Sequence, residues 1–182
     1  MNQVQDQETT DYIALRRLQN RYADIVTRRA WPELAEIFHP DCTLNLELGD
    51  RSAQFAGPEA VGKFIGDSVE RFSFFEFVVL NTVLEIRSSR NKAVARMYIH
   101  ELRVESATGK RTDAYGVYHD RFIRDESAGW QFQKRYYGSF SRTAPDDAAE
   151  DQVVFPLPER NLSTWIDAVS YTHLTLPTIY SV

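Results

Sequence analysis

The chain has 182 residues, 43% of them hydrophobic and 13% aromatic, with a formal net charge of −5 and one cysteine. A chain of this size can fold as one domain with a substantial core. Its acidic balance, without a basic cluster, argues against a nucleic-acid partner, and the lone Cys42 excludes an internal disulfide framework and a cysteine-based zinc site.

The N-terminal segment, MNQVQDQETTDY, lacks the basic and apolar regions of a leader sequence. No apolar run in the chain reaches membrane-spanning length. We therefore expect a cytoplasmic protein with no membrane partner, and we expect residues 1–10 to be disordered.

Three helices are predicted in the N-terminal half. Apolar residues at helical spacing indicate the first over 11–29, with Thr10 or Asp11 as its cap. Pro32 fits the first turn of a short second helix, and Pro58 fits the first turn of a third. Between the second and third helices, alternating residues indicate two short strands.

Long alternating strands are predicted for the second half, over 74–87, 92–106, 111–124 and 129–140. Their connections have hairpin length, so this part of the sheet should be antiparallel. Helices followed by hairpins are the order of an α+β fold. No glycine-rich phosphate loop is present, and we expect no nucleotide cofactor.

The composition changes after Arg142. Residues 143–168 are rich in Ala, Pro and acidic residues, and we expect a loosely packed tail that wraps the domain through Val153 to Phe155. The next residues, VSYTHLTLPT, resemble the in-frame translation of a sequencing adapter. We therefore interpret 169–182 as a non-native tail and 11–142 as the domain itself.

Three segments together carry a resemblance to a known family: LQNRYA at 18–23, AWPELAEIF at 30–38, and the hairpin TDAYGVYHDRFIRDESAGWQFQKRYY at 112–137. They resemble the SnoaL-like branch of the nuclear-transport-factor-2-like superfamily, which includes scytalone dehydratase. The resemblance implies a cone, in which a curved, mostly antiparallel sheet packs on about three N-terminal helices around an apolar pocket. It also implies a small hydrophobic molecule as the partner, and the open sheet face suggests a homodimer.

Relatives that run acid–base chemistry, such as scytalone dehydratase and hexachlorocyclohexane dehydrochlorinase, pair an Asp near the end of the first helix with a His on the first long strand. The carboxylate orients the imidazole that acts as the base. Counted from the matching segments, these positions fall on Thr27 and Phe77, so the usual dyad is replaced. Asp24, one turn earlier, is an alternative for the first role, although helical spacing places it on a solvated face.

His100 is the remaining candidate for acid–base catalysis. It shares a strand face with Tyr98 and Leu102, which we expect to point inward. A core histidine satisfied by a hydrogen bond is the alternative interpretation. His119 is expected to face outward and His39 to end a helix, and four scattered histidines give no metal site.

Residues with inward parity are predicted to wall the pocket and bind the substrate: Tyr22, Thr27, Leu46, Leu48, Phe64, Phe77, Val79 and Tyr118. The alternative is that the aromatic side chains simply fill the cone.

Two functions stay open. The first is a lyase, isomerase or cyclase without cofactor or metal, in which His100, Tyr98 and Asp24 are catalytic. The second is a non-catalytic ligand-binding or accessory protein, including a partner subunit like the β-subunit of ring-hydroxylating dioxygenases.

Overall fold

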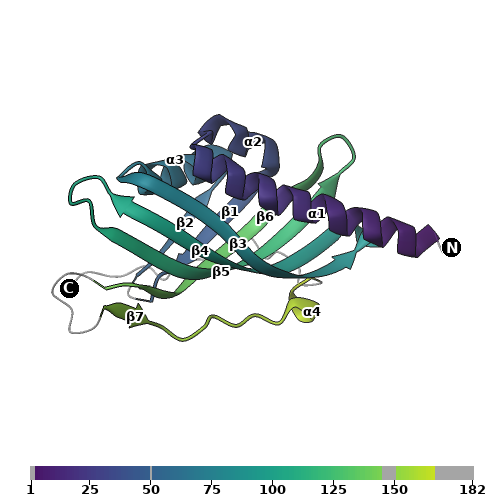
Figure 1. Ribbon diagram of the computed structural model, residues 1–182. Helices are drawn as coiled ribbons and strands as arrows, with labels where there is room; N and C mark the ends of the chain where they lie inside the picture. The colour runs from purple at the N-terminus through teal and green to yellow at the C-terminus, as the bar shows by residue number, and fades with distance from the viewer. Residues whose placement is uncertain (1–2, 50, 145–150, 167–182) are drawn as a thin grey trace, which may run out of the picture.

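A curved seven-stranded sheet organises the chain, whose computed structural model describes residues 3–49, 51–144 and 151–166. The strand order is β2-β1-β6-β5-β4-β3, with β7 paired to β6. Strands β1 and β6 are parallel and all other described neighbours are antiparallel. The predicted α+β fold, with a curved sheet and N-terminal helices, is therefore confirmed (Figure 1).

The helices are α1 (Gln3–Arg28), η1 (Trp31–Glu33), α2 (Leu34–Ile37), α3 (Pro58–Val69), η2 (Ser88–Arg90) and α4 (Leu162–Trp165). The strands are β1 (Phe38–Glu47), β2 (Ser52–Ala56), β3 (Phe72–Arg87), β4 (Lys92–Glu105), β5 (Arg111–Asp125), β6 (Gly129–Thr143) and β7 (Gln152–Val154). Helices α1 to α3 lie on one side of the sheet, and β7 and α4 cross the other side (Figure 1).

The long hairpins form where the sequence predicts them, because their turns carry suitable residues. In the turn between β5 and β6, the Asp125 carboxylate accepts hydrogen bonds from the backbone N–H groups of Ser127 and Ala128. Gly129 closes this turn with a φ of 76°, a left-handed conformation that glycine adopts at little cost. The result is a set of long adjacent strands, β3 to β6.

Irregularities in the ladders bend this sheet. The register shifts on β3 between Val79 and Asn81, and on β6 opposite Arg121 and Phe122. Each extra residue increases the local twist and reverses the faces of the residues that follow it. The strands consequently curl around the helices instead of lying flat.

The first helix begins earlier than predicted. Residues 3–10, expected to be disordered, form its first turns. Asp11, expected to be a cap, is buried and accepts hydrogen bonds from Arg124 Nη1 at 2.7 Å and Trp130 Nε1 at 3.1 Å. These bonds join α1 to the β5–β6 hairpin. Asp11 therefore lies within the helix and does not cap it, and the helix begins before residue 11.

The core lies between the helices and the inner face of the sheet. Its fully buried members include Leu15, Ile25, Val61, Met97, Ile99 and Phe132. Each such side chain contributes about 1.5–3 kcal/mol of hydrophobic free energy. Cys42 is buried among them, and burial raises the pKa of its thiol to about 11, so it is an inert structural residue.

A C-terminal strap, residues 151–166, covers part of the outer face of the sheet (Figure 1). The Phe155 backbone N–H donates to the Phe140 carbonyl at 2.9 Å. Leu162 and Ile166 pack on Val94 and are 5% and 0% exposed. The tail is thus more closely packed than the sequence predicted. The adapter-like residues 169–182 lie outside the described residues.

His119 lies on the outer face, as predicted, but it is only 2% exposed. Its Nε2 has no hydrogen-bond partner in the described part of the chain. Burial, together with the positive charges of Arg160 in the strap and Arg96 on β4, lowers the pKa of His119 from 6.5 to about 4. The imidazole is therefore neutral in the folded protein at neutral pH.

This neutral histidine predicts an acid-sensitive stability. As pH falls from 6.5 to 4, the unfolded chain gains a proton that the folded chain resists, so the free energy of unfolding should drop by about 2–3 kcal/mol. Carboxylates also titrate in this range, so the measurement compares urea unfolding of wild type and His119→Gln across these pH values. The variant should lose less stability over the same range, and identical pH profiles would contradict the assignment.

Candidate functional site

A cavity of about 810 Å³ lies between α3, the β1–β2 hairpin and the inner face of β3 to β6. Apolar and aromatic side chains form much of its wall, among them Leu44, Leu46, Phe64, Phe72, Phe75 and Phe77. Its volume is in the range of sites that bind small molecules. Six residues predicted to wall the pocket line it: Tyr22, Leu46, Leu48, Phe64, Phe77 and Tyr118.

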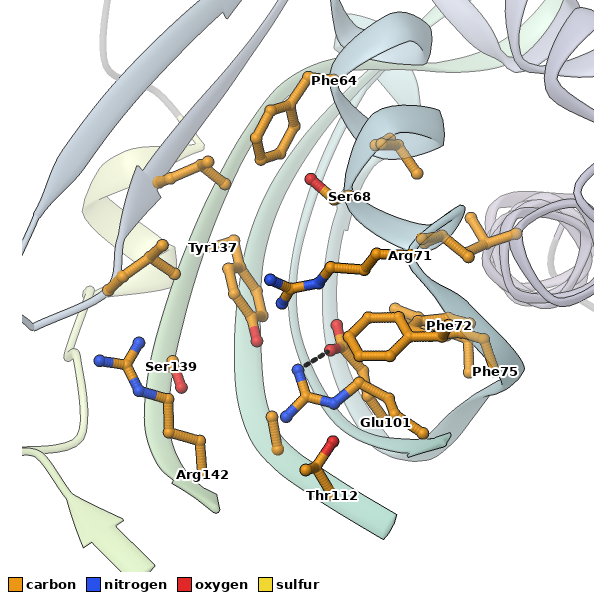
Figure 2. Close-up of a pocket in the computed structure, with 18 of the residues that line it drawn as sticks. Phe64, Ser68, Arg71, Phe72, Phe75, Glu101, Thr112, Tyr137, Ser139 and Arg142 are labelled. Carbon is orange, nitrogen blue, oxygen red and sulfur yellow. Dashed lines mark ion pairs between the residues drawn. The ribbon is translucent and has the colours of Figure 1, made fainter. Parts of the chain in front are cut away.

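The polar part of the wall is centred on Glu101 of β4 (Figure 2). Glu101 Oε2 lies 3.5 Å from Arg103 Nη1, and the Arg71 guanidinium points into the same part of the cavity (Figure 2). Burial raises the pKa of the Glu101 carboxyl, while Arg103, Arg71 and His100 act against this increase. Because its pKa is raised, this carboxyl group accepts a proton more readily than an exposed glutamate does.

Tyrosine hydroxyl groups lie at the inner end of the cavity. The Tyr22 and Tyr118 oxygens are 3.4 Å apart, and the Phe77 ring packs 5.4 Å from the Tyr22 ring. Burial raises the pKa of Tyr118 well above its ordinary value, so the group stays protonated and can donate a hydrogen bond. Tyr137 lines the cavity from β6.

The ring of Tyr137 occupies space that a side chain on β5 would otherwise fill. A Cβ atom added to Gly116 would lie 2.2 Å from Cε2 of Tyr137. Glycine at this position therefore lets the ring lie against the sheet, within the cavity wall.

A buried ion pair between Arg135 and Asp120 packs against the rings of Tyr22 and Tyr118. Arg135 Nε and Nη2 contact the Asp120 carboxylate at 2.7 and 3.1 Å, with the side chains 1% and 0% exposed. The Arg135 guanidinium also lies 4.0 Å from the ring centres of both Tyr22 and Tyr118. Burial raises the pKa of Asp120 and Arg135 acts against this, and the short bidentate contact is that of an ionised pair.

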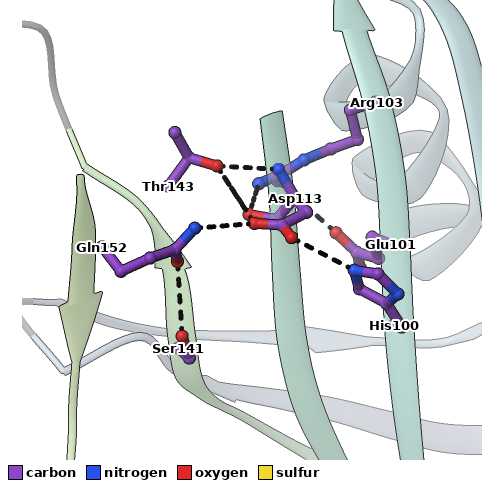
Figure 3. A network of polar contacts seen from close by, with 7 residues as sticks. All are labelled: His100, Glu101, Arg103, Asp113, Ser141, Thr143 and Gln152. Atoms are coloured by element: carbon purple, nitrogen blue, oxygen red, sulfur yellow. Dashed lines mark hydrogen bonds and ion pairs between the residues drawn. The ribbon is translucent and has the colours of Figure 1, made fainter. Parts of the chain in front are cut away.

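His100 does not line the cavity, whereas its neighbour Glu101 does, so His100 lies on the opposite, outer face of β4 and the prediction that it points inward was wrong. Its polar contacts are shown in Figure 3. Its Nε2 is 3.3 Å from Asp113 Oδ2, and its ring stacks on Tyr115 at 4.1 Å. Burial acts to raise the pKa of Asp113, but hydrogen bonds from Gln152, His100 and Thr143 lower it overall. This network anchors β7, the first strand of the strap, to the sheet.

The remaining predicted residues also lie outside the cavity wall. Tyr98 shares the outer face with His100 and packs 6.4 Å from Phe140. Asp24 is exposed and pairs with Arg28 at 2.8 Å, the solvated position that helical spacing allowed. Val79 packs at the edge of the core.

The two positions counted for the replaced dyad do lie together. The Phe77 backbone N–H donates to the Thr27 hydroxyl at 3.1 Å, which joins the end of α1 to β3. The Phe77 side chain lines the cavity, whereas Thr27 does not. The two residues that the sequence count assigned to the dyad therefore form a structural contact.

Glu101, Arg103 and Arg71 were not among the site residues predicted from the sequence. The face of β4 was assigned from Leu102, whereas the buried series Ala95, Met97 and Ile99 continues to Glu101 on the inner face. That apolar series in the sequence could have indicated that Glu101, and not His100, points inward. Arg71 lies just after the end of α3. Whether its side chain points into the cavity depends on how α3 packs on the sheet, which the sequence does not show.

Two absences hold for the described residues, 3–49, 51–144 and 151–166. No group of three or more His, Cys, Asp or Glu side chains there is arranged to hold a metal ion. None of the helices there is long and apolar enough to cross a membrane.

A curved sheet wrapped around helices with a cavity inside is the cone fold of the nuclear-transport-factor-2-like superfamily. A sequence model of the SnoaL-like domain matches residues 7–136, and the chain therefore belongs to the SnoaL-like domain family. No curated protein matches the chain.

Solved structures support the same fold. A scytalone dehydratase-like protein from Novosphingobium aromaticivorans shares 17% identity, covers 85% of this chain and 99% of its own, and superposes with a TM-score of 0.68. A hexachlorocyclohexane dehydrochlorinase (LinA-type3) from Novosphingobium barchaimii shares 19%, with 84% and 98% covered and a TM-score of 0.66. A superfamily member from Salmonella enterica shares 16%, with 78% and 99% covered and a TM-score of 0.65.

Proposed function

We propose that this chain binds one small, largely apolar molecule in the cavity and moves a proton on it, as a lyase or isomerase that needs no cofactor. The single observation that carries the proposal is a cavity of about 810 Å³ with an aromatic wall and, in its polar part, the carboxyl group of Glu101, whose side chain is 16% exposed and whose pKa is raised. Similar structures include proteins named for dehydration and dehydrochlorination. Both names describe eliminations, which need a base.

Glu101 is the proposed base. A buried carboxyl group with a raised pKa is a stronger base than an exposed one. Tyr118 and Tyr137 are the proposed donors to an oxygen of the substrate that gains negative charge. His100, the candidate from sequence, is not proposed for this role because its ring lies on the outer face with Asp113.

A non-catalytic ligand-binding protein is the second candidate. It is supported by the contact between Thr27 and Phe77, the two positions to which the sequence count assigns the dyad of relatives with acid–base chemistry. Neither side chain exchanges protons near neutral pH. Binding is common to both candidates, so it is tested first and turnover separates them.

The binding step is tested with the neutral fluorescent probe N-phenyl-1-naphthylamine. We expect saturable binding to one site, weakened at least about tenfold by Ser68→Trp, because a larger side chain on α3 would fill the cavity. Ser89→Trp, in the exposed turn between β3 and β4, is the matched control and should bind like wild type. Equal binding by Ser68→Trp, or no saturable binding at all, would refute the proposal.

A further inference from the structure

The charge of the cavity wall differs in sign from that of the whole protein. The chain has a net charge of −5, yet the described residues that line the cavity include five basic and three acidic side chains. One acidic member, Asp67, already pairs with Lys63 at 2.7 Å. A concave surface with this excess favours a ligand with negative charge.

Two buried donors in the wall are without partners. Arg103 Nε and Thr112 Oγ1 are both inaccessible and make no hydrogen bond within the described ranges. The two residues are opposite each other in the β4–β5 ladder, and both line the cavity. A buried polar atom without a partner destabilises the fold. Rotation of the Thr112 side chain toward the cavity would present its hydroxyl to an acceptor oxygen of a ligand and remove this cost.

Arg103 is held in place before any ligand arrives. Its Nη2 donates to the Asp113 backbone oxygen at 2.7 Å, and its Nη1 lies 3.5 Å from Glu101. A guanidinium fixed in this way loses little conformational entropy when it binds a further oxygen.

Arg71 supplies a second positive charge. Its guanidinium carbon lies 4.6 Å from the ring centre of Phe72, and Arg103 lies 5.3 Å from the same centre. Figure 2 shows the Arg71 side chain reaching across the cavity toward Tyr137. Arg71 makes no ion-pair contact with Glu101, although its charge acts on that carboxyl.

We propose that the molecule bound in this cavity carries one carboxylate on an aromatic or similarly apolar body, and that Arg71 and Arg103 bind this carboxylate. The apolar body lies against Phe64, Phe75 and Phe77. Thr112 donates its hydroxyl to the carboxylate, and Glu101 remains paired with Arg103 beside the apolar body. The inference rests on the proposed function and adds the chemical class of the ligand.

The test compares two probes of equal shape, 2-naphthoate and 2-naphthamide, titrated by calorimetry into the full chain. At low salt we expect 2-naphthoate to bind about tenfold more tightly than 2-naphthamide. This difference is typical of a charge-assisted contact that solvent partly screens. Arg71→Met keeps the aliphatic stem over Phe72 and should remove most of this preference without weakening the amide. Arg17→Met, on the exposed side of α1, is the matched control.

The outcomes separate this inference from the proposed function. If both probes bind wild type equally, the carboxylate assignment is wrong and the proposed apolar site stands. A preference that persists unchanged in Arg71→Met would also overturn the assignment. If neither probe binds, and N-phenyl-1-naphthylamine does not bind either, the proposed function itself fails.

Discussion

Replacing Glu101 with glutamine is expected to lower kcat by about 10²- to 10⁴-fold, the usual effect of losing a general base. Glutamine keeps the size and the hydrogen-bonding oxygen of the side chain, so Arg103 retains an acceptor and the fold should survive. Turnover is measured by ultraviolet absorbance on a substrate found by screening aromatic hydroxy acids for loss of water. Circular dichroism checks that the variant is folded.

The pH dependence gives a second readout. Because burial raises the pKa of Glu101, kcat/KM should rise with pH through a value above the ordinary 4.5 of a glutamate. Carbon NMR of the labelled side chain can locate the same titration without a substrate. Glu105→Gln is the matched control, since Glu105 also lines the cavity but accepts a hydrogen bond from Thr108 in the turn.

His100→Ala separates the two candidate bases. If Glu101 is the base, this variant should keep nearly full turnover and lose only stability from its contacts with Asp113 and Tyr115. Full activity in folded Glu101→Gln would reject the role of Glu101.

Replacing Arg135 with methionine is expected to destabilise the fold by about 3–5 kcal/mol, because it leaves the Asp120 carboxylate buried without its partner. The loss includes the contacts of the guanidinium with Tyr22 and Tyr118, which lie at the inner end of the cavity. Urea unfolding at pH 7 measures the change in the free energy of unfolding.

An exposed pair of the same length provides the control. Lys63 Nζ lies 2.7 Å from Asp67, the same distance as Arg135 Nε from Asp120, but its side chains are 74% and 66% exposed. Lys63→Met should cost at most about 0.5 kcal/mol, because solvent screens the pair.

A double variant tests the origin of the loss. Asp120→Leu with Arg135→Met removes both charges and should be more stable than Arg135→Met alone. If the double variant is as unstable as the single variant, the cost arises from lost packing and not from an unpaired charge. A change below about 1 kcal/mol in Arg135→Met would show that the pair contributes little.

Within residues 11–142, the sequence alone determined the order and type of the main helices and strands. Hairpin-length connections such as 125–129 restrict neighbouring strands to antiparallel pairing, and a proline at position 58 suits the first turn of a helix but not its interior. These are local constraints, set by a few adjacent residues. They led to the α+β class, whereas the cone and its pocket were implied by the resemblance to the SnoaL-like family, and strand parity within that cone led to six residues of the cavity wall.

Only the tertiary structure decided which face of β4 points into the cavity. Strand alternation has two possible parities, and β4 carries apolar residues on both faces: Met97 and Ile99 on the inner face, Leu102 and Val104 on the outer face. Register shifts in β3 and β6 also change which residues of these strands point into the cavity. The choice of Glu101 over His100 therefore depends on how the curved sheet closes around α1 and α3.

Contacts between residues that are far apart in the chain could not be predicted from the sequence either. Asp120 meets Arg135 because β5 and β6 align them in one ladder, and Asp11 meets Trp130 because α1 crosses that hairpin. Composition indicated an irregular C-terminal tail, whereas the packing of this tail depends on Val94, which β4 presents on its outer face to Leu162 and Ile166. Such contacts follow from the arrangement of whole elements, and local propensity carries no information about them.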